Sequence, residues 1–396
     1  MNDYSASESE ETKELPMNEY TAAALRLHRY MMNNHWHNGG LVGPDPGIRF
    51  NYRLFRFVKS YAPAFDWNDS MYYIQAQGYW ILVNWKLFDI TGDEAYRTIA
   101  RICSETLREH QRPDGAWEYP NPEWKGRIVT SEGTWGAIGL LETYRQTHDQ
   151  ATLDSILHWW SFLQTEIGFQ QQGNELAVNY GVTDRKARVP NNTAFVLRFL
   201  TELAEVTGLE NDAERRSQLL NFLRSAQTPD GEIPYAVEGE AGSIPRDHFQ
   251  CIQYNAFEVL DLMRYYELTG DAAALTVIQP MLHFLEQGIG HDGHAFYQCG
   301  ESHHTVTYHT AVLAAAFTKA NALGIGNYMS LPNRAYHYVL DQQRADGSFP
   351  HSKGDYGILS DHRSYPRYLA MIALHLLQAD PIANRKEDAQ SVLRTT

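Results

Sequence analysis

The sequence predicts an all-α protein in which six helical hairpins close into a ring, a single-domain (α/α)6 toroid. An internal repeat and an alternation of apolar with charged helices carry this prediction. Three strong copies of one loop lie 116 residues apart, at Gln111–Pro120, Gln227–Ala236 and Gln343–Ser352. Weaker copies lie at Ile167–Tyr180 and Ile289–Cys299, and the glycine-rich Trp36–Gly47 is taken as the first member. Six loops at intervals of roughly 60 residues leave room for two helices each.

Twelve helices follow from apolar periodicity and from start and stop signals. The expected ranges are Asn18–Asn33, Ser70–Ile90, Glu94–His110, Ser131–Thr147, Thr152–Glu166, Asn191–Thr207, Asp212–Ala226, Phe249–Thr269, Ala272–Gln287, Thr307–Leu323, Leu331–Arg344 and Arg363–Gln378. Each strong loop carries an Asp-Gly turn, at Asp114, Asp230 and Asp346, because Gly tolerates positive φ and Asp can bond its own backbone.

Three of the helices end in a shared Thr-Gly stop, at Gly92, Gly208 and Gly270. The helix before each stop is apolar almost all round, and the helix after it carries more charge. We therefore expect the apolar helices to form an inner ring and the charged helices an outer ring. The long loops then enter the N-terminal ends of the inner helices, which gather at one mouth of the ring.

Composition restricts the class of partner. The chain has 396 residues, 43% of them hydrophobic and 12% aromatic, which is enough for a large core. Its net charge of −15 argues against nonspecific binding to nucleic acid or to an anionic membrane, since Lys and Arg contacts drive both. No apolar run has the length of a membrane span. The expected partner is a small-molecule or oligosaccharide substrate, and the oligomeric state stays open.

The cysteines and the two ends complete the domain prediction. Three cysteines, Cys103, Cys251 and Cys299, form no disulfide framework and predict a reducing, cytoplasmic compartment. Residues 1–17 read as a disordered acidic tail without the apolar core of a signal peptide. Residues 18–380 form the toroid, and residues 381–396 are expected to be frayed.

The alternating helices resemble those of α/α-toroid proteins. The strong loops look like the Gln-rich, Asp-Gly, aromatic repeats of the squalene cyclase and prenyltransferase superfamily. The resemblance covers about Asn18 to Gln378 and implies the fold. It does not imply one activity, because the fold serves cyclases, prenyltransferases, lyases, glycosidases and sugar epimerases.

Polar residues at the starts of the inner helices are the candidates for the functional site. The candidate catalytic residues are Asp69, Glu132, Tyr254, Tyr308, His309 and Tyr365. The candidate substrate-binding residues are Tyr72, Tyr73, Gln75, Gln77, Trp135, Asn191, Asn192, Gln253, Asn255, Arg363 and Arg367. Each also has a structural interpretation: Asp69 and the two asparagines suit helix caps, and Glu132 suits a first helical turn through the helix dipole.

A zinc site is an alternative within the same region, although no cofactor is expected. Tyr308-His309-Thr310 looks like the last zinc-binding element of the protein prenyltransferases, with Asp247 and Cys251 as the other ligands. Asp247 and Cys251 are four residues apart here rather than two, so the match departs from that family's pattern.

The first functional hypothesis is a carbohydrate-active enzyme acting on an acidic or uronic-acid glycan by acid/base chemistry. Tyr72-Tyr73-Ile74-Gln75-Ala76-Gln77 resembles a segment of the glucuronyl C5-epimerases, which implies that its Tyr and Gln side chains line a pocket. For epimerisation or elimination, Tyr254, His309 or Glu132 would be the base and Tyr308 or Tyr365 the acid.

In the same hypothesis, Arg363 and Arg367 would hold the substrate carboxylate. For hydrolysis, Asp69 and Glu132 would be the paired carboxylates.

An isoprenoid-handling enzyme with an aromatic cavity is the second hypothesis. The Asp-rich motifs of terpenoid cyclases do not occur in the sequence. A non-catalytic toroid that binds a glycan or a partner is the third.

Overall fold

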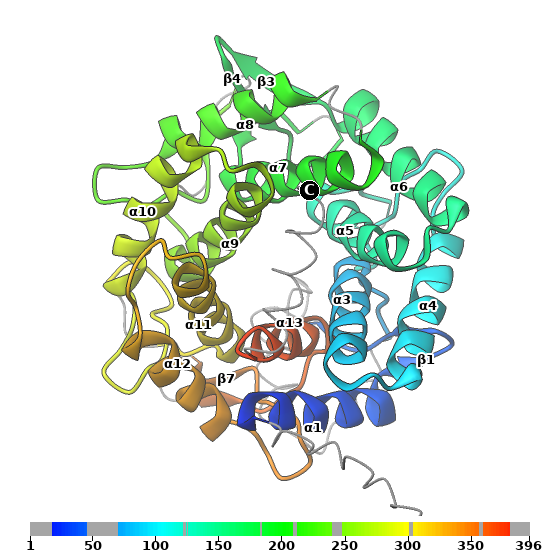
Figure 1. Ribbon diagram of the computed structural model, residues 1–396, viewed down its shortest axis with the longest axis vertical. Helices are drawn as coiled ribbons and strands as arrows, with labels where there is room; N and C mark the ends of the chain where they lie inside the picture. Colours follow the sequence, from blue (N-terminus) through cyan, green and yellow to red (C-terminus); the bar gives the residue numbers. More distant parts are fainter. Residues whose placement is uncertain are drawn as a thin grey trace, which may run out of the picture.

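The computed structural model describes residues 18–45, 70–121, 124, 126–182, 184–208, 212–239, 248–300, 304–355 and 359–380. Within these residues, six inner and six outer helices form a closed ring, as Figure 1 shows. The inner helices are α3 (Ile74–Thr91), α5 (Thr130–Thr147), α7 (Pro190–Thr207), α9 (Cys251–Thr269), α11 (Thr307–Ala322) and α13 (Pro366–Leu377). The outer helices are α1 (Glu19–Asn34), α4 (Glu94–Glu109), α6 (Gln150–Phe162), α8 (Ala213–Ala226), α10 (Ala272–Glu286) and α12 (Ser330–Asp341).

The predicted (α/α)6 fold is therefore confirmed. Each inner helix packs on the next, and α13 packs on α3 to close the inner ring. The sixth hairpin joins the two ends of the described chain, because α1 is the outer partner of α13. The predicted tails, residues 1–17 and 381–396, lie outside the described residues.

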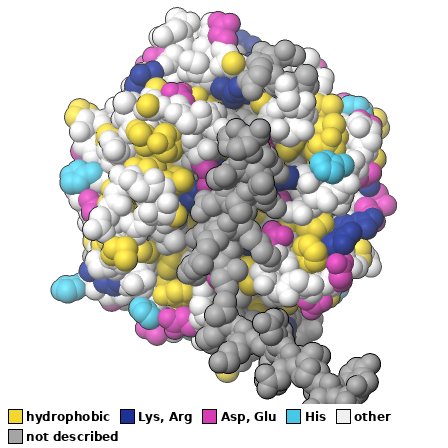
Figure 2. Space-filling model, in the orientation of Figure 1, with side chains coloured by type: hydrophobic (Ala, Val, Ile, Leu, Met, Phe, Trp, Pro, Cys, Tyr) yellow, Lys and Arg dark blue, Asp and Glu magenta, His cyan; other side chains and the backbone are white. Residues whose placement is uncertain are grey.

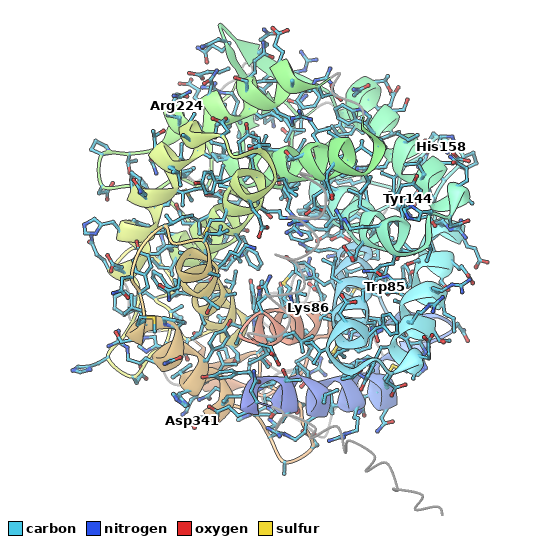
Figure 3. The ribbon with its side chains drawn as sticks, in the orientation of Figure 1. Trp85, Lys86, Tyr144, His158, Arg224 and Asp341 are labelled. Atoms are coloured by element: carbon cyan, nitrogen blue, oxygen red, sulfur yellow. A yellow bond between two sulfur atoms is a disulfide. The ribbon has the colours of Figure 1, made fainter. Side chains whose placement is uncertain are left out.

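Inner and outer helices differ in burial as the sequence predicts. Nearly every residue in the middle of α3 is buried, whereas α4 buries only one stripe that includes Cys103 and Leu107. Figure 3 shows His158 and Arg224 pointing outward from the outer ring, while Trp85 of α3 lies between the two rings. Its indole Nε1 donates to Thr143 Oγ1 of α5 at 2.9 Å, so a polar atom is satisfied inside the core.

The Thr-Gly stops end their helices in the left-handed conformation. Gly92, Gly208 and Gly270 have φ of 70°, 69° and 67°. The fourth equivalent position, at the end of α5, is His148 with φ 54°, where a side chain makes this conformation costly. Asp93 and Asp271 then cap the outer helices α4 and α10 through their side chains.

The glutamine that opens each strong loop fastens the loop to an outer helix. Gln111 Nε2 donates to the carbonyl of Gly115 at 2.8 Å and to that of Ser155 in α6 at 3.0 Å. Gln227 and Gln343 repeat the pair of bonds with their own loop glycines and with Val277 and Ala23. The last bond reaches α1, so the third copy of the motif ties the end of the ring to its beginning.

The glycine of the Asp-Gly turn is required by both conformation and space. Gly115 has φ +91°, and a Cβ there would lie 2.5 Å from the carbonyl oxygen of His158. Gly231 and Gly347 meet the carbonyls of Pro280 and Arg26 in the same way. The repeated glutamine and glycine thus allow each strong loop to pack closely against an outer helix.

Short antiparallel hairpins lie in the loops. They pair β1 (Trp36–His37) with β2 (Gly40–Leu41), β3 (Phe169–Gln172) with β4 (Glu175–Val178), and β7 (Ser352–Asp355) with β8 (Leu359–Asp361). A fourth antiparallel pair, β5 (Ala187–Arg188) with β6 (Val237–Glu238), joins the loop before α7 to the loop after α8. In β3–β4, Phe169 pairs with Val178, and the hairpin projects from the ring in Figure 1.

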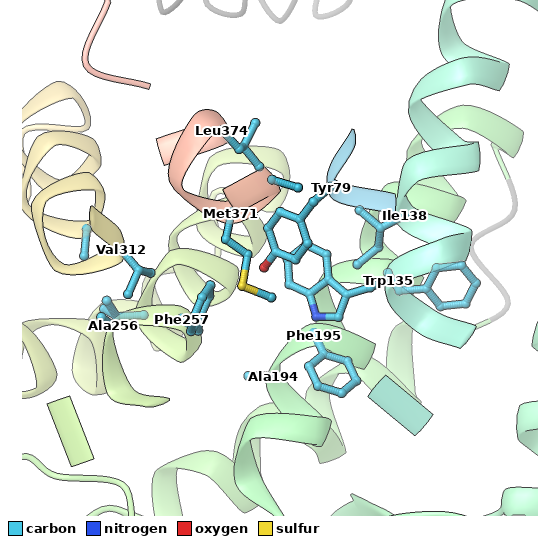
Figure 4. Close-up of a cluster of buried hydrophobic side chains, with 14 of the residues drawn as sticks. Tyr79, Trp135, Ile138, Ala194, Phe195, Ala256, Phe257, Val312, Met371 and Leu374 are labelled. Carbon is cyan, nitrogen blue, oxygen red and sulfur yellow. The ribbon is translucent and has the colours of Figure 1, made fainter. Parts of the chain in front are cut away.

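An apolar floor closes the middle of the ring. Tyr79, Trp135, Phe195, Phe257 and Met371 converge there from five inner helices, as Figure 4 shows. Trp135 stacks on Tyr79 with ring centroids 4.4 Å apart.

Buried ion pairs continue from this floor. Arg198 lies 5.3 Å from the Trp135 ring centroid and pairs with Glu202 and Asp261. Glu202 and Asp261 are buried, so loss of Arg198 would leave buried carboxyl groups without this partner, at a cost in stability.

The cysteines contradict the sequence-based interpretation. Cys251 and Cys299 form a disulfide, and Cys103 is free and buried. The expectation of three unpaired cysteines is wrong because the ring brings the start of α9 beside the loop before α11, 48 residues later. The cytoplasmic location that rested partly on it stays a prediction.

Two surface properties agree with the composition. Figure 2 shows positive and negative side chains interspersed around the rim of the face it displays. Among the described residues, no helix has both the length and the apolar character needed to cross a bilayer.

Candidate active site

A cavity of about 310 Å³ lies inside the ring, above the apolar floor. Its walls come from the N-terminal parts of the inner helices and from the loops that lead into them. These parts meet because the inner helices all run in the same direction. Eight of its lining residues are tyrosines: Tyr79, Tyr119, Tyr180, Tyr235, Tyr254, Tyr297, Tyr308 and Tyr368. Amide side chains of Gln75, Asn191, Asn192, Gln250 and Gln253 lie between them. Aromatic faces with interspersed hydrogen-bonding groups suit a polar, ring-shaped ligand.

Arg367 is the one cation among the arginine and lysine residues of the described chain that lines this cavity. It is the second residue of α13, and its Nη2 lies 2.8 Å from Asp45 Oδ2. Its guanidinium lies over the rings of Tyr73 and Tyr368, 4.4 and 4.9 Å from their centroids. Arg367 Nε is buried and has no hydrogen-bond partner among the described residues.

Glu132 lies behind the cavity wall and is 1% exposed. Its Oε2 accepts from the Gln75 N–H at 3.0 Å, so it caps α3, whose own N-cap residue makes no side-chain bond. Its Oε1 lies 3.8 Å from Arg367 Nη1. Burial raises the pKa of Glu132 to about 7, against the lowering effects of Arg367 and of the Gln75 backbone. Glu132 is thus a titratable neighbour of Arg367.

His309 is the third residue of α11 and lines the same cavity. It is buried and stacks on Tyr297, with centroids 5.7 Å apart. Burial and the neighbouring His351 lower the pKa of His309 well below its usual value, so its ring is neutral near pH 7. Its Nδ1 is buried and has no hydrogen-bond partner among the described residues.

The phenols around His309 are protonated near pH 7. Burial raises the pKa values of Tyr254 and Tyr308 well above the usual phenol range. Tyr308 stacks on Tyr368 at 4.3 Å between centroids, and His351 lies 5.2 Å from Tyr368. The site therefore combines the neutral imidazole of His309 with phenol donors in one desolvated space.

The structure brings many of the predicted residues to the cavity. These are Gln75, Trp135, Asn191, Asn192, Gln253, Tyr254, Tyr308, His309 and Arg367. Tyr73 and Glu132 lie directly behind it, in contact with or close to Arg367. Asp69 lies outside the described residues.

Other predicted residues are not brought to the cavity. Gln77 bonds to the backbone of Leu41 and Tyr73. Asn255 does the same with Ile233 and Cys251, so these two amides hold loops in place.

The remaining predicted residues are also occupied away from the main cavity. Tyr72 stacks on His110 with centroids 4.2 Å apart. Tyr365 donates to Asp361 Oδ2 at 2.9 Å. Arg363 precedes α13, and its backbone is bonded to Asp361 and His351. These three side chains do not line the cavity.

The sequence analysis did not predict the part of the cavity wall that comes from the repeated loops. Tyr119, Tyr235, Tyr297 and His351 each lie five residues after the aspartate of an Asp-Gly turn, and all four line the cavity. This equivalent position was the signal available in the sequence. Asp45, the partner of Arg367, carried no comparable signal.

The predicted zinc ligands are not assembled as a set. Asp247 lies outside the described residues, and Cys251 is bonded to Cys299. His309 stacks on Tyr297 and does not belong to the group of possible ligands around Cys251. That group consists of Glu232, His248, Cys251 and Cys299, and none of the four lines the cavity.

Comparison with solved structures places the fold among α/α-toroid enzymes. Cellobiose 2-epimerase from Bacillus thermoamylovorans matches with a TM-score of 0.71 and 15% identity, over 92% of this chain and 100% of that one. A possible member of the GH105 family from Klebsiella pneumoniae matches with a TM-score of 0.67 and 13% identity, over 98% and 99%.

A third similar structure contains a bound oligosaccharide. It is an inactive variant of a glycoside hydrolase family 76 α-1,6-mannanase from Salegentibacter in complex with α-1,6-mannotriose, with a TM-score of 0.64, 15% identity and coverage of 91% and 99%. At such identities the likeness shows the fold alone. No family model and no curated protein matches the sequence. The resemblances to squalene cyclases and to glucuronyl C5-epimerases are not shown by these comparisons.

Proposed function

We propose that the chain is a carbohydrate-active enzyme that transfers a proton at a sugar carbon next to a carbonyl or carboxylate group. The observation that carries the proposal is that a neutral His309 and the Arg367 guanidinium line the same tyrosine-rich cavity. The solved structures with this fold include a sugar epimerase and glycoside hydrolases, which supports a carbohydrate substrate.

The proposed chemistry assigns one role to each side chain. The His309 imidazole takes the proton from carbon, and the Arg367 guanidinium donates to the adjacent oxygen as negative charge develops there. Tyr308 or Tyr254 supplies a proton to the product side. Delivery of that proton to the carbon from the face opposite His309 gives an epimer, whereas its delivery to the leaving oxygen of a neighbouring substituent gives an unsaturated sugar.

Two-carboxylate hydrolysis has less support. No Asp or Glu among the described residues lines the cavity, whereas glycoside hydrolysis ordinarily uses two carboxyl groups that flank the scissile bond. An isoprenoid substrate also has less support, because five amide side chains line the cavity and an apolar chain would leave them unpaired.

The charge of the substrate is a finer question within this proposal. Asp45 already balances Arg367, and Glu132 adds a second carboxyl group close by. The positive charge of Arg367 is therefore already compensated. An acidic sugar would gain one directed hydrogen bond from Arg367 but no attraction to an unpaired positive charge. We propose uronic-acid and neutral sugars as the two substrate sets to compare.

The test is an NMR assay of the purified full chain with neutral and uronic-acid mono- and oligosaccharides. The account predicts an epimer or an unsaturated product, and a loss of roughly 100-fold or more in turnover for His309→Gln. The matched control is His283→Gln on the exposed side of α10. New reducing ends without either product would establish hydrolysis and reject the proposal, and binding without turnover would make the chain a non-catalytic toroid.

A further inference from the structure

Two cysteines, a histidine and a glutamate form a second chemical cluster beside the cavity. Cys251 opens α9, Cys299 lies in the loop before α11, and Glu232 follows the Asp-Gly turn of the second strong loop. His248 lies just before α9. The candidate ligand atoms of the four residues all lie within 4.8 Å of one another.

The distances within the cluster are those of a compact ligand set. His248 Nδ1 lies 2.9 Å from Glu232 Oε1, and Cys299 Sγ lies 3.3 Å from the same oxygen. In tetrahedral zinc sites with Zn–N near 2.0 Å and Zn–S near 2.3 Å, neighbouring ligand atoms lie roughly 3.3–3.8 Å apart. A bound ion would require the bond between the two sulfurs to open and the 2.9 Å contact between His248 and Glu232 to lengthen to about 3.3 Å.

The chemistry of the ligands selects the metal. Two thiolates with an imidazole and a carboxylate form a mixed soft and borderline set that suits Zn²⁺ in four-coordinate geometry. Glu232 is 4% exposed, and thiolates beside its carboxylate would repel it without a cation. Glu232 and Cys251 are buried while His248 and Cys299 are exposed, so an ion can enter from solvent.

We propose that Glu232, His248, Cys251 and Cys299 form a zinc site in the reduced protein, and that the disulfide and the zinc ion are alternative cross-links between the same loops. A dithiol reductant transfers two electrons and two protons to the disulfide, which breaks the S–S bond and gives two thiols. Zinc binding then releases one proton from each thiol as two Zn–S bonds form. Exchange of the thiolates with an external disulfide, which accepts two electrons and is reduced to two thiols, re-forms the S–S bond and releases the ion.

Either cross-link would hold one wall of the cavity. Gln250 and Tyr297 both line the cavity, and Gln250 Nε2 donates to Tyr297 Oη at 2.9 Å. Gln298 Nε2 donates to the His248 carbonyl at 3.3 Å, which joins the same two loops. The cluster therefore serves as a structural clamp and contributes no ligand to the substrate cavity.

The test measures zinc binding by the full chain in both redox states. Protein is reduced with dithiothreitol, freed of it under anaerobic conditions, and dialysed against zinc sulfate before elemental analysis. One zinc ion per reduced chain and none per oxidised chain is the expected result. His248→Ala and Cys299→Ser should each weaken binding at least tenfold, whereas Cys103→Ser and the exposed His291→Ala should not.

Three results would overturn the proposal: no zinc in the reduced chain, equal zinc in the oxidised chain, or unchanged binding in His248→Ala and Cys299→Ser. If a variant fails to fold, cobalt titration of the reduced wild-type chain decides. Thiolate-to-cobalt charge-transfer bands with the intense visible bands of tetrahedral Co²⁺ support the site, and their absence rejects it. Because metal content is measured without substrate, failure here is distinguishable from failure of the proposed sugar chemistry.

Discussion

Replacing Glu132 by Gln should make the protein less sensitive to rising pH. Glu132 is 1% exposed, and burial raises its pKa from 4.5 to about 7 in the folded chain. The folded protein therefore holds this proton more tightly than the unfolded chain. Its stabilising contribution is complete below pH 4.5 and is lost as the pH rises through about 7.

The magnitude follows from the two pKa values. The difference between about 7 and 4.5 corresponds to about 3 kcal/mol, of which about 2.5 kcal/mol falls between pH 5 and pH 8. Gln keeps an oxygen that can accept from the Gln75 N–H, so the cap of α3 is retained. Between pH 5 and pH 8, the free energy of unfolding of the wild type should therefore fall by about 2.5 kcal/mol more than that of the Glu132→Gln variant.

Urea unfolding at pH 5 and pH 8, followed by tryptophan fluorescence, measures the change. The difference between variant and wild type isolates Glu132 from the other titrating groups. Glu105→Gln, on the exposed side of α4, is the matched control and should show no pH-dependent difference. If Glu132→Gln and the wild type lose the same stability from pH 5 to pH 8, the buried protonated carboxyl group is refuted.

Three further outcomes follow from the fold. Gln343→Ala removes the bond to Ala23 that closes the ring and should lower the free energy of unfolding by about 1–3 kcal/mol, as measured by urea unfolding. His148 adopts a left-handed backbone conformation that is costly for a residue with a side chain, so His148→Gly should raise the free energy of unfolding by about 1 kcal/mol and raise the melting temperature. A lower melting temperature would contradict this. Asn255→Ala leaves the buried backbone of Ile233 unpaired and should lower the free energy of unfolding by about 2–3 kcal/mol, whereas an unchanged value would show that Asn255 holds no loop.

The helical framework could be predicted because its signals are local. Apolar periodicity and the Thr-Gly stops place the helices to within a few residues, and Gly92 and Gly270 adopt the expected conformation. The strong loop repeats in sequence because each copy docks on an outer helix through the same glutamine and glycine contacts.

The site could be predicted only in part because its contacts are distant in sequence. The direction of the inner helices was enough to place Arg367, His309 and Trp135 at one cavity. Closure of the ring is what brings Asp45 to Arg367, and no local pattern encodes that pair. The Cys251–Cys299 disulfide was missed for the same reason.

Short polar motifs also had competing structural uses. Gln75 and Gln77 belong to one segment, yet Gln75 lines the cavity while Gln77 holds the backbone of Leu41. The two side chains point in nearly opposite directions because residues two apart are separated by about 200° around a helix such as α3. A sequence resemblance assigns the segment but not the direction of each side chain.

The most direct test of the proposed proton transfer is deuterium incorporation from heavy water into the sugars that the enzyme converts, measured by mass spectrometry and NMR. The account predicts carbon-bound deuterium next to the carbonyl or carboxylate group, in recovered substrate or in product, and its loss in His309→Gln. Conversion of a sugar with no deuterium bound to carbon in either pool would contradict proton abstraction and the role given to His309.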